Sequence, residues 1–279
     1  MTFTEKLKRT VTGSKSLLCV GLDPVPERIP EPLAKKYSNR SDLVLEFCSR
    51  VIDVTKDHAC AYKPNTAFFE ALGSPGWEIL EQTIQHIPKE KVIIADAKRG
   101  DIGNTAAQYK KAFFDELNAD AITLNALMGM DTLDPFIDDE EKAVFVLAMT
   151  SNRGSADFLQ RRFQGRMSLG EYIAEELSKK QEKSLTHLGM VVGATQIESI
   201  GSVIQTNPEA HLLIPGIGKQ GGSVSDLQAV LKYHNGIPVI NSSRSIIYAG
   251  SNQADWESAV SRAALEMKQS LKELTERYV

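Results

Sequence analysis

The sequence predicts an α/β protein, a single (β/α)8 TIM barrel that spans residues 1–279. Short apolar segments rich in β-branched residues alternate with longer segments of helical periodicity along the whole chain. Eight such segments fit a barrel, which typically takes about 250 residues. An open doubly wound sheet is the alternative, but no Gly-x-Gly-x-x-Gly motif follows the first apolar segment.

The predicted strands are, in order, Leu17–Leu22, Ala59–Tyr62, Val92–Ala95, Ala121–Leu124, Ala143–Ala148, Leu188–Val192, His211–Ile214 and Ile237–Ile240. Between the first two, Ser41–Asp57 places apolar residues three and four positions apart and is predicted as an amphipathic helix. Two S/T-x-x-Q motifs, beginning at Thr105 and Ser225, predict helix starts. Residues 151–184 depart from the regular alternation and are predicted as an insertion, whose basic part favours a solvated loop and helix over a substrate lid.

Composition and charge restrict the class of protein. A net charge of −4 and a pI near 5.8 argue against a nucleic-acid partner, because a broad nucleic-acid surface needs a strong basic excess. The N-terminus lacks an apolar signal segment, and no run approaches the ~20 apolar residues of a membrane span. We therefore expect a cytoplasmic protein with no membrane partner. Cys19, Cys48 and Cys60 show no metal-ligand spacing and are predicted to be reduced, buried and inert.

The strongest functional signal follows the third predicted strand, where Asp96, Lys98 and Asp101 come directly after a buried apolar run. Residues two apart on a strand share a face, so Asp96 and Lys98 are predicted to project together. A solvated salt-bridge cluster explains this spacing as well as a catalytic cluster does. The neighbouring carboxylates favour the protonated form of Lys98, which suits an acid or a cationic stabiliser and argues against a Schiff-base lysine.

Polar and charged residues recur at the ends of other predicted strands. The active site of a barrel lies at the C-terminal ends of its strands, so these residues are predicted to converge. They are Asp23 after the first strand, Lys63 after the second, Thr150 and Ser151 after the fifth, and Arg244 after the eighth. Each alone could be a turn residue or a surface charge, but their coincidence favours a site. No nucleophilic triad accompanies them, because the five histidines fall in predicted helices or near strand starts.

The connections after the last two strands predict a phosphate site. The segment 215–222, which includes Gly218, is glycine-rich and would let backbone N–H groups approach an anion closely. Arg244 offers a planar fork of donors for phosphate oxygens. The loops after the seventh and eighth strands commonly hold phosphate in such barrels. A glycine-rich loop alone could be a flexible turn, so the prediction rests on both connections together.

In these residues the chain resembles the orotidine 5′-phosphate decarboxylase family, and in particular its longer bacterial-type subgroup. The resemblance is carried by the motif Asp96-x-Lys98-x-x-Asp101-Ile102-x-x-Thr105, with Asp23, Lys63 and Arg244 at other strand ends, and spans nearly the whole barrel. It implies conversion of orotidine 5′-monophosphate to uridine 5′-monophosphate and CO2 in pyrimidine synthesis, with no metal and no organic cofactor.

The resemblance also implies the roles of the charged residues. The alternating charged network of the family is matched by Lys63, Asp96, Lys98 and Asp101. In that network Lys98 donates the proton to C6 of the pyrimidine, while Asp23 and Lys63 contact the ribose hydroxyls. Residues that reach the neighbouring subunit's active site are matched by Asp101, Ile102 and Thr105. A homodimer with shared active sites is therefore implied.

The remaining substrate contacts are assigned in the same way. Arg244 matches the phosphate-binding arginine of the family, and Gln220 matches the glutamine that bridges base and phosphate. Thr150 or Ser151 matches the hydroxyl that contacts the pyrimidine, with the preceding methionine favouring Thr150.

Two other functions fit parts of the sequence. Magnesium-dependent sugar-phosphate enzymes of the same superfamily, such as 3-keto-6-phosphogulonate decarboxylase or hexulose-phosphate synthase, resemble the chain at the first and third strands. They carry a glutamate on the second strand, where the cation of Lys63 would repel Mg²⁺. The other alternative is a catalytically inactive nucleotide-binding barrel, against which the complete charged network argues.

Overall fold

The computed structural model describes residues 1–163, 165–194, 197–216 and 223–279. Among these residues, eight parallel strands form a closed barrel in the order β1-β10-β9-β8-β5-β4-β3-β2, and β6 pairs with β7 in a separate small sheet. The barrel strands are β1 (Leu18–Leu22), β2 (Ala61–Pro64), β3 (Val92–Arg99), β4 (Ala121–Leu124), β5 (Ala143–Met149), β8 (His187–Val192), β9 (Leu212–Pro215) and β10 (Pro238–Ser242). The closed order confirms the predicted (β/α)8 barrel and rules out the open doubly wound sheet.

The polar ends of the strands account for most differences from the predicted bounds. The third predicted strand stops at Ala95, whereas β3 continues through Asp96 to Arg99. The second was predicted two residues too early, because Lys63 and Pro64 belong to β2. An apolar run indicates only the part of a strand that lies in the barrel core. The hydrogen-bonded strand continues beyond it into polar residues, which the apolar pattern does not detect.

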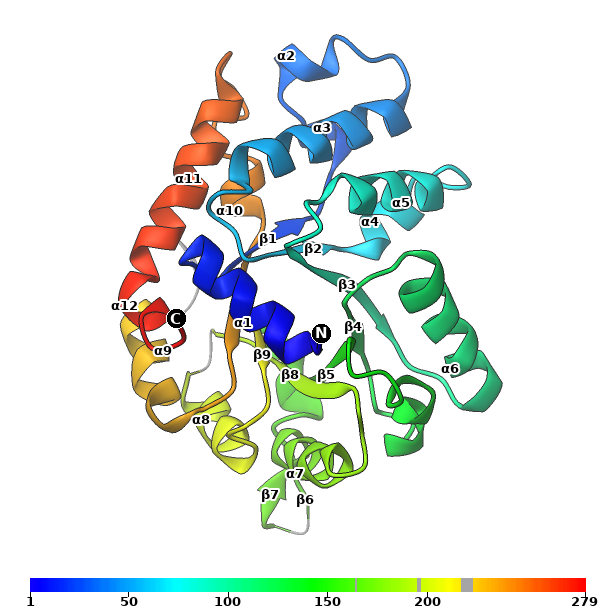
Figure 1. The fold of residues 1–279 in the computed structure, drawn as a ribbon, viewed down its shortest axis with the longest axis vertical. Coiled ribbons are helices and arrows are strands. Elements are labelled where there is room, and N and C mark those ends of the chain that lie inside the picture. The colour runs from blue at the N-terminus through cyan, green and yellow to red at the C-terminus, as the bar shows by residue number, and fades with distance from the viewer. Residues whose placement is uncertain (164, 195–196, 217–222) are drawn as a thin grey trace. The chain divides into compact units, whose positions relative to one another are not determined.

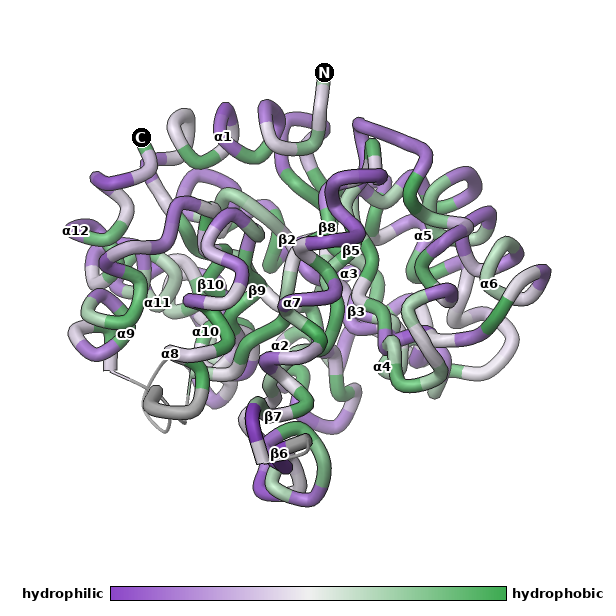
Figure 2. The backbone as a smooth tube through the Cα atoms, turned by 90° about the horizontal axis from the view of Figure 1, so that it is seen from below, coloured by the Kyte–Doolittle hydropathy of each residue, from purple (hydrophilic) through white to green (hydrophobic). Residues whose placement is uncertain are grey.

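The helices are α1 (Phe3–Ser14), α2 (Glu31–Ala34), α3 (Arg40–Thr55), α4 (Thr66–Glu70), α5 (Gly76–His86), α6 (Gly103–Lys110), α7 (Leu169–Gln181), α8 (Ile197–Thr206), α9 (Val224–Val230), α10 (Arg244–Ile247), α11 (Trp256–Ser270) and α12 (Lys272–Thr275). Short turns of other helix types are η1 (Pro26–Arg28), η2 (Lys111–Glu116), η3 (Met130–Phe136), η4 (Arg153–Asp157) and η5 (Leu231–Tyr233). The helix α3 confirms the predicted amphipathic helix over 41–57. Hydrophilic and hydrophobic residues alternate along α5 in the same manner (Figure 2). In the described part of the chain, no helix has the length and apolar character needed to span a membrane.

The two predicted capping motifs are wrong in detail. The helix α6 begins at Gly103, so Thr105 already lies within it and no side chain caps its start. The helix α9 is capped by Ser223, whose Oγ accepts a hydrogen bond from the N–H of Ser225 at 3.2 Å. The S/T-x-x-Q spacing caps a helix only where its first residue keeps an extended backbone, and the spacing alone does not show where that is.

The chain divides into two compact units, one of residues 1–5 and 98–240 and the other of residues 6–97 and 241–279. In the second unit, α3 packs against both α5 and α11 (Figure 1). The strand β2 pairs in parallel with β1 and β3, with Ala61 opposite both Cys19 and Val92. This register decides which polar residues meet where the three strands end.

In the first unit, β5 pairs with β4 and β8, and α7 packs against β5 and β8 (Figure 1). Residues 151–184 hold η4, the hairpin of β6 (Arg162–Phe163) and β7 (Met167–Ser168), and then α7. A capping box starts α7, because Ser168 Oγ accepts from the N–H of Glu171 and Glu171 Oε2 accepts from the N–H of Ser168. The hairpin was not predicted, since two-residue strands leave no periodic signal.

The three cysteines are free and buried, as the sequence predicts. Burial raises the pKa of each thiol above its ordinary value, and raises that of Cys60 to about 12. The thiolate is the reactive form of cysteine, so all three are inert near neutral pH.

Two histidines form a buried stack in the first unit. The rings of His187 and His211 lie 3.9 Å apart between centroids. His187 Nε2 accepts a hydrogen bond from the N–H of His211, and His211 Nδ1 accepts one from the N–H of Ile237, each at 2.9 Å. Burial lowers the pKa of His187 to about 4 and that of His211 well below its ordinary value. Both rings are therefore neutral and structural.

This stack is expected to make the fold sensitive to mild acid. In the unfolded chain both rings take up protons near pH 6.5, whereas in the folded chain they do not, so the free energy of unfolding falls as the pH drops from about 6.5 toward 4. We compare how far the free energy of unfolding falls between pH 7.5 and pH 5. The fall should be about 2 kcal/mol smaller in a His187→Gln variant than in the parent chain. Urea titrations at the two pH values measure the difference. Full acid sensitivity in His187→Gln would assign the effect to other groups.

Candidate active site

A buried ion pair joins the ends of β2 and β3. Lys63 Nζ lies 2.6 Å from Asp96 Oδ2, and the two side chains are 5% and 9% exposed. The strand register causes this contact. Asn65 lies opposite Asp96 in the parallel ladder. Lys63 comes two residues before Asn65, so its side chain is on the same face of the sheet and lies diagonally across from Asp96. Burying two charges contributes little to stability, which makes the pair a candidate for function.

The ammonium of Lys63 stays charged although it is buried. Burial by itself lowers the pKa of Lys63, but the charges of Asp96 and Asp23 together outweigh that effect, and the pKa is raised above its ordinary value. A fixed cation therefore stands between the ends of β1 and β3. Such a site disfavours a divalent metal ion and favours an anionic or hydroxyl-rich ligand.

Residues from the C-terminal part of the chain hold the loop that carries Asp23. Ser243 Oγ donates a hydrogen bond to Asp23 Oδ2 at 2.6 Å. The Tyr248 hydroxyl donates to the carbonyl of Asp23 at 3.0 Å and accepts from the N–H of Val25 at 2.6 Å. The guanidinium of Arg28 covers the Tyr248 ring at 4.2 Å from its centroid. These contacts fix the backbone of Asp23 as well as its side chain.

Two buried oxygen atoms near this loop lack a hydrogen-bond partner within the described ranges, Asp23 Oδ1 and Asn241 Oδ1. A Cβ at Gly21 would lie 3.0 Å from Asn241 Oδ1 and 2.8 Å from Ser243 Cβ, so glycine is what lets β1 approach these side chains. Unpaired buried acceptors are unfavourable in a folded protein. Hydroxyl groups of a ligand would supply the donors that they lack.

In the first unit, Lys98 has a left-handed backbone with φ of 48°. The prediction that Asp96 and Lys98 project together assumed regular strand geometry, and that regularity is interrupted at Lys98. Asp96 is buried and Lys98 is exposed. A non-glycine residue in this conformation carries about 1–3 kcal/mol of strain, and such residues cluster at functional sites.

Residues 100–105, which follow β3, are exposed or half-buried. Asp101 Oδ1 accepts a hydrogen bond from the N–H of Ile102 at 2.8 Å. Ile102, the residue before α6, is 50% exposed. Thr105 lies exposed in the first turn of α6. This segment is therefore available for contact with another molecule.

Thr150 and Ser151 directly follow β5, as predicted. Thr150 Oγ1 donates a hydrogen bond to Asn152 Oδ1 at 2.7 Å. The backbone of Ser151 packs closely on Gly193, where a Cβ would lie 2.6 Å from the Ser151 nitrogen. Both hydroxyl residues stay candidates for a ligand contact.

The predicted phosphate site is described in part. Arg244 directly follows Ser243 at the first position of α10 and is exposed. Gly218 and Gln220 belong to residues 217–222, which lie outside the described residues.

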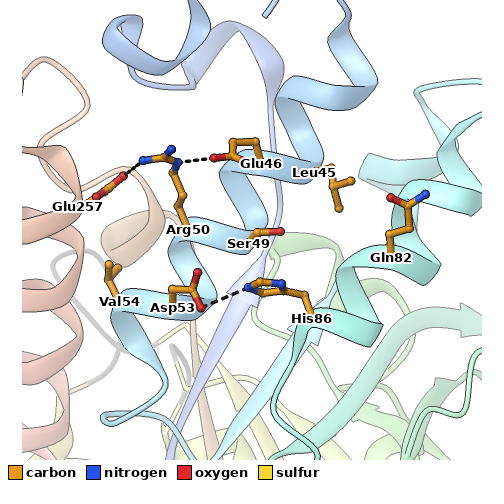
Figure 3. A pocket seen from close by; sticks show the side chains of 9 residues that line it. All are labelled: Leu45, Glu46, Ser49, Arg50, Asp53, Val54, Gln82, His86 and Glu257. Carbon is orange, nitrogen blue, oxygen red and sulfur yellow. Dashed lines mark hydrogen bonds and ion pairs between the residues drawn. The ribbon is translucent and has the colours of Figure 1, made fainter. Parts of the chain in front are cut away.

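A cavity of about 550 Å³ lies among α3, α5 and α11 and is lined by helix residues alone (Figure 3). Its polar side chains bind one another. Arg50 Nε lies 2.6 Å from Glu46 Oε1, and Arg50 Nη1 lies 2.6 Å from Glu257 Oε1. His86 Nε2 lies 3.2 Å from Asp53 Oδ1. None of the predicted site residues lines this cavity, and its charges are already paired.

Three residues that contribute to this region were not assigned a role from the sequence. Ser243 and Asn241 belong to a polar run after the eighth predicted strand, in which only Arg244 was singled out. Tyr248 carries no sequence signal at all, because its partner loop lies 225 residues away along the chain. The polar run itself was the usable signal for Ser243 and Asn241.

Comparison with known proteins gives a consistent result. The sequence model of the orotidine 5′-phosphate decarboxylase / HUMPS family matches residues 16–259. A protein of Herpetosiphon aurantiacus named orotidine 5′-phosphate decarboxylase is 43% identical over 271 residues, covering 96% of this chain and 98% of that protein. A Dehalococcoides mccartyi protein of the same name is 41% identical and is matched over the full length of both chains. The structure of Leishmania donovani OMP decarboxylase superposes with a TM-score of 0.81, at 34% identity and 99% coverage of both chains.

Proposed function

Because the chain belongs to the orotidine 5′-phosphate decarboxylase / HUMPS family, we propose that it decarboxylates orotidine 5′-monophosphate. The products are uridine 5′-monophosphate and CO2, in a step of pyrimidine biosynthesis. The enzyme is a carboxy-lyase that needs no metal ion and no organic cofactor, and it works in the cytoplasm.

The buried pair of Lys63 and Asp96 is the observation that carries this proposal. The ammonium of Lys63 is held 2.6 Å from Asp96 Oδ2 and is charged, although both side chains are almost fully buried. A magnesium-dependent sugar-phosphate enzyme would need a carboxylate on β2 at this place, and a fixed cation there opposes metal binding. The pair thus favours the decarboxylase over its closest rival.

The chemistry requires fixed charge near the reacting carbon. Loss of CO2 breaks the C6–carboxyl bond and leaves the electron pair on C6, where delocalisation is poor, so stabilisation must come from a preorganised cation. We assign that cation to Lys98, which then donates a proton from Nζ to C6. Asp96 lies on the same strand and would repel the substrate carboxylate, a repulsion that disappears as CO2 departs. Binding of the remote phosphate can offset that strain.

The other candidate residues are assigned to substrate binding. Asp23 and Lys63 take the ribose hydroxyls, and the acceptor atom of Asp23 that lacks a partner within the described ranges supports this assignment. Arg244 binds the phosphate, together with the glycine-rich segment that includes Gly218 and Gln220. A hydroxyl of Thr150 or Ser151 contacts the pyrimidine.

We further propose a homodimer with shared active sites. Asp101, Ile102 and Thr105 would reach the partner's site. Exposed apolar side chains support an interface here, since Leu127 and Met128 in the loop after β4 are 74% and 58% exposed and Ile102 is 50% exposed. The loops that carry them follow β3 and β4, which are neighbours in the barrel, and the N–H of Asn125 donates to the carbonyl of Arg99.

Decarboxylation is expected to be independent of metal ions. Turnover of orotidine 5′-monophosphate should survive exhaustive chelation and should not change when Mg²⁺ is added, because the cations of Lys63 and Lys98 occupy the role that a metal would play. The assay follows the loss of the substrate's ultraviolet absorbance before and after chelation. A strict requirement for Mg²⁺, with turnover of a sugar phosphate, would replace the proposal by its rival. Binding of the nucleotide without turnover would identify an inactive barrel.

A further inference from the structure

Three contacts fix the end of β3 against the end of β4 within the first unit. The N–H of Lys98 donates a hydrogen bond to Thr123 Oγ1 at 2.9 Å. The N–H of Asn125 donates to the carbonyl of Arg99 at 2.7 Å. A Cβ at Gly100 would lie 2.3 Å from the carbonyl oxygen of Asn125, so the chain here runs as close to β4 as glycine allows. We call these contacts the β3–β4 clamp.

The clamp surrounds a residue in an unfavourable conformation. In the described part of the chain, Lys98 is one of three non-glycine residues with positive φ, and the other two, Lys15 and Asn118, lie outside the strands. A left-handed lysine persists only where its surroundings determine the backbone. The hydrogen bond between Asn125 and Arg99 is made by backbone atoms alone, and the close approach at Gly100 requires that no side chain be present there. The third depends on a side chain, the hydroxyl of Thr123.

Thr123 is itself held rigidly. It is 1% exposed, in the interior of β4, and its backbone lies opposite Phe145 in the ladder with β5. The hydrogen bond that the Lys98 N–H donates to this fixed hydroxyl therefore sets the position of the Lys98 backbone. The position matters because a displacement of about 1 Å at a reacting group can reduce a rate by roughly 100-fold.

We propose that Thr123 is a positioning residue, whose hydroxyl holds the backbone of Lys98 in the left-handed conformation from which its ammonium reaches the reacting carbon. This inference rests on the proposed function of Lys98 as the proton donor. Thr123 acts through Lys98 and makes no contact with substrate. Its removal should therefore slow the chemical step and leave substrate affinity almost unchanged.

Two substitutions at Thr123 separate this role from a merely structural one. Thr123→Val keeps the shape of the side chain and suits a strand, but removes the hydroxyl that accepts from Lys98. Thr123→Ser keeps that hydroxyl. We expect Thr123→Val to lower kcat by roughly 10- to 100-fold with KM within about threefold of the parent, and Thr123→Ser to recover most of kcat. The matched control is Thr83→Val on α5, which removes a buried hydroxyl that has no partner in the described ranges and should leave both constants unchanged.

The second measurement does not depend on turnover. Hydrogen exchange of the Lys98 amide, resolved by NMR, should be faster in Thr123→Val than in the parent and should be restored in Thr123→Ser. Parent-like kcat and amide exchange in Thr123→Val would overturn the inference, and so would a loss of kcat that Thr123→Ser shares. Failure of the proposed function would look different. The parent chain would then lack turnover, or Lys98→Ala would retain it, while the exchange of the Lys98 amide would still report on the clamp.

Discussion

Replacing Lys98 with alanine is expected to lower kcat for orotidine 5′-monophosphate by roughly 10⁴-fold or more while the fold remains intact. The reason is that one group is proposed to perform two tasks. General acid catalysis contributes about 10²- to 10⁴-fold, and a preorganised charge contributes about 10²- to 10³-fold. The Lys98 side chain is exposed, so its truncation leaves no cavity. Single-turnover assays give the rate, and circular dichroism with urea unfolding reports on the fold.

The control is an exposed lysine of the same unit that has no proposed role. Lys183→Ala, after α7, should behave like the parent in every assay. If Lys98→Ala turned over substrate at nearly the parental rate, Lys98 could be neither the cation nor the proton donor. The assignment of the charged network would then have to be rebuilt around Lys63.

The second large effect is expected from mixing two inactive chains. Lys98→Ala and Asp101→Ala should each have almost no activity, yet their co-expression should restore it. In a heterodimer with the shared sites that we propose, each chain would supply Lys98 to its own site and Asp101 to its partner's, so one site would lack both residues and the other would have both. With random pairing about half of the dimers are heterodimers, so activity should approach roughly a quarter of the parental value.

The subunits must be able to exchange, which co-expression with two different affinity tags ensures. Heterodimers purified through both tags should have about half the parental activity per dimer, since one of two sites is complete. The negative control co-expresses two copies of the Lys98→Ala chain, each with a different affinity tag. Confirmed heterodimers as inactive as either parent would mean that Asp101 acts within its own chain.

The sequence predicted the barrel because its signal is repetitive. Eight apolar segments alternate with amphipathic ones, and a misplaced boundary in one of them does not change the closed strand order. The errors fall at strand ends and helix starts. The polar end of β3 was predicted to lie outside the strand, and Thr105 was predicted to cap a helix that it sits inside. At these positions tertiary contacts outweigh local preference.

The candidate site was predictable wherever it depends on register. Lys63 and Asp96 were predicted to converge because parallel strands end together, and the structure joins them at 2.6 Å. The left-handed backbone of Lys98 could not be predicted, because no local residue preference favours it. Its backbone N–H donates to the hydroxyl of Thr123, which is 25 residues away and carries no motif. Contacts of this kind are set by packing alone.

The hydrogen bonds that hold Asp23 have a consequence for how the chain becomes active during its synthesis. The Asp23 loop is among the first parts to leave the ribosome, while Ser243 and Tyr248 follow 220 and 225 residues later. At ordinary elongation rates that interval lasts roughly 10 to 45 seconds. Through this time a nascent chain carries Lys63 and Asp96 without a fixed Asp23. A chain that stops before Ser243 therefore lacks the contacts that fix this carboxylate.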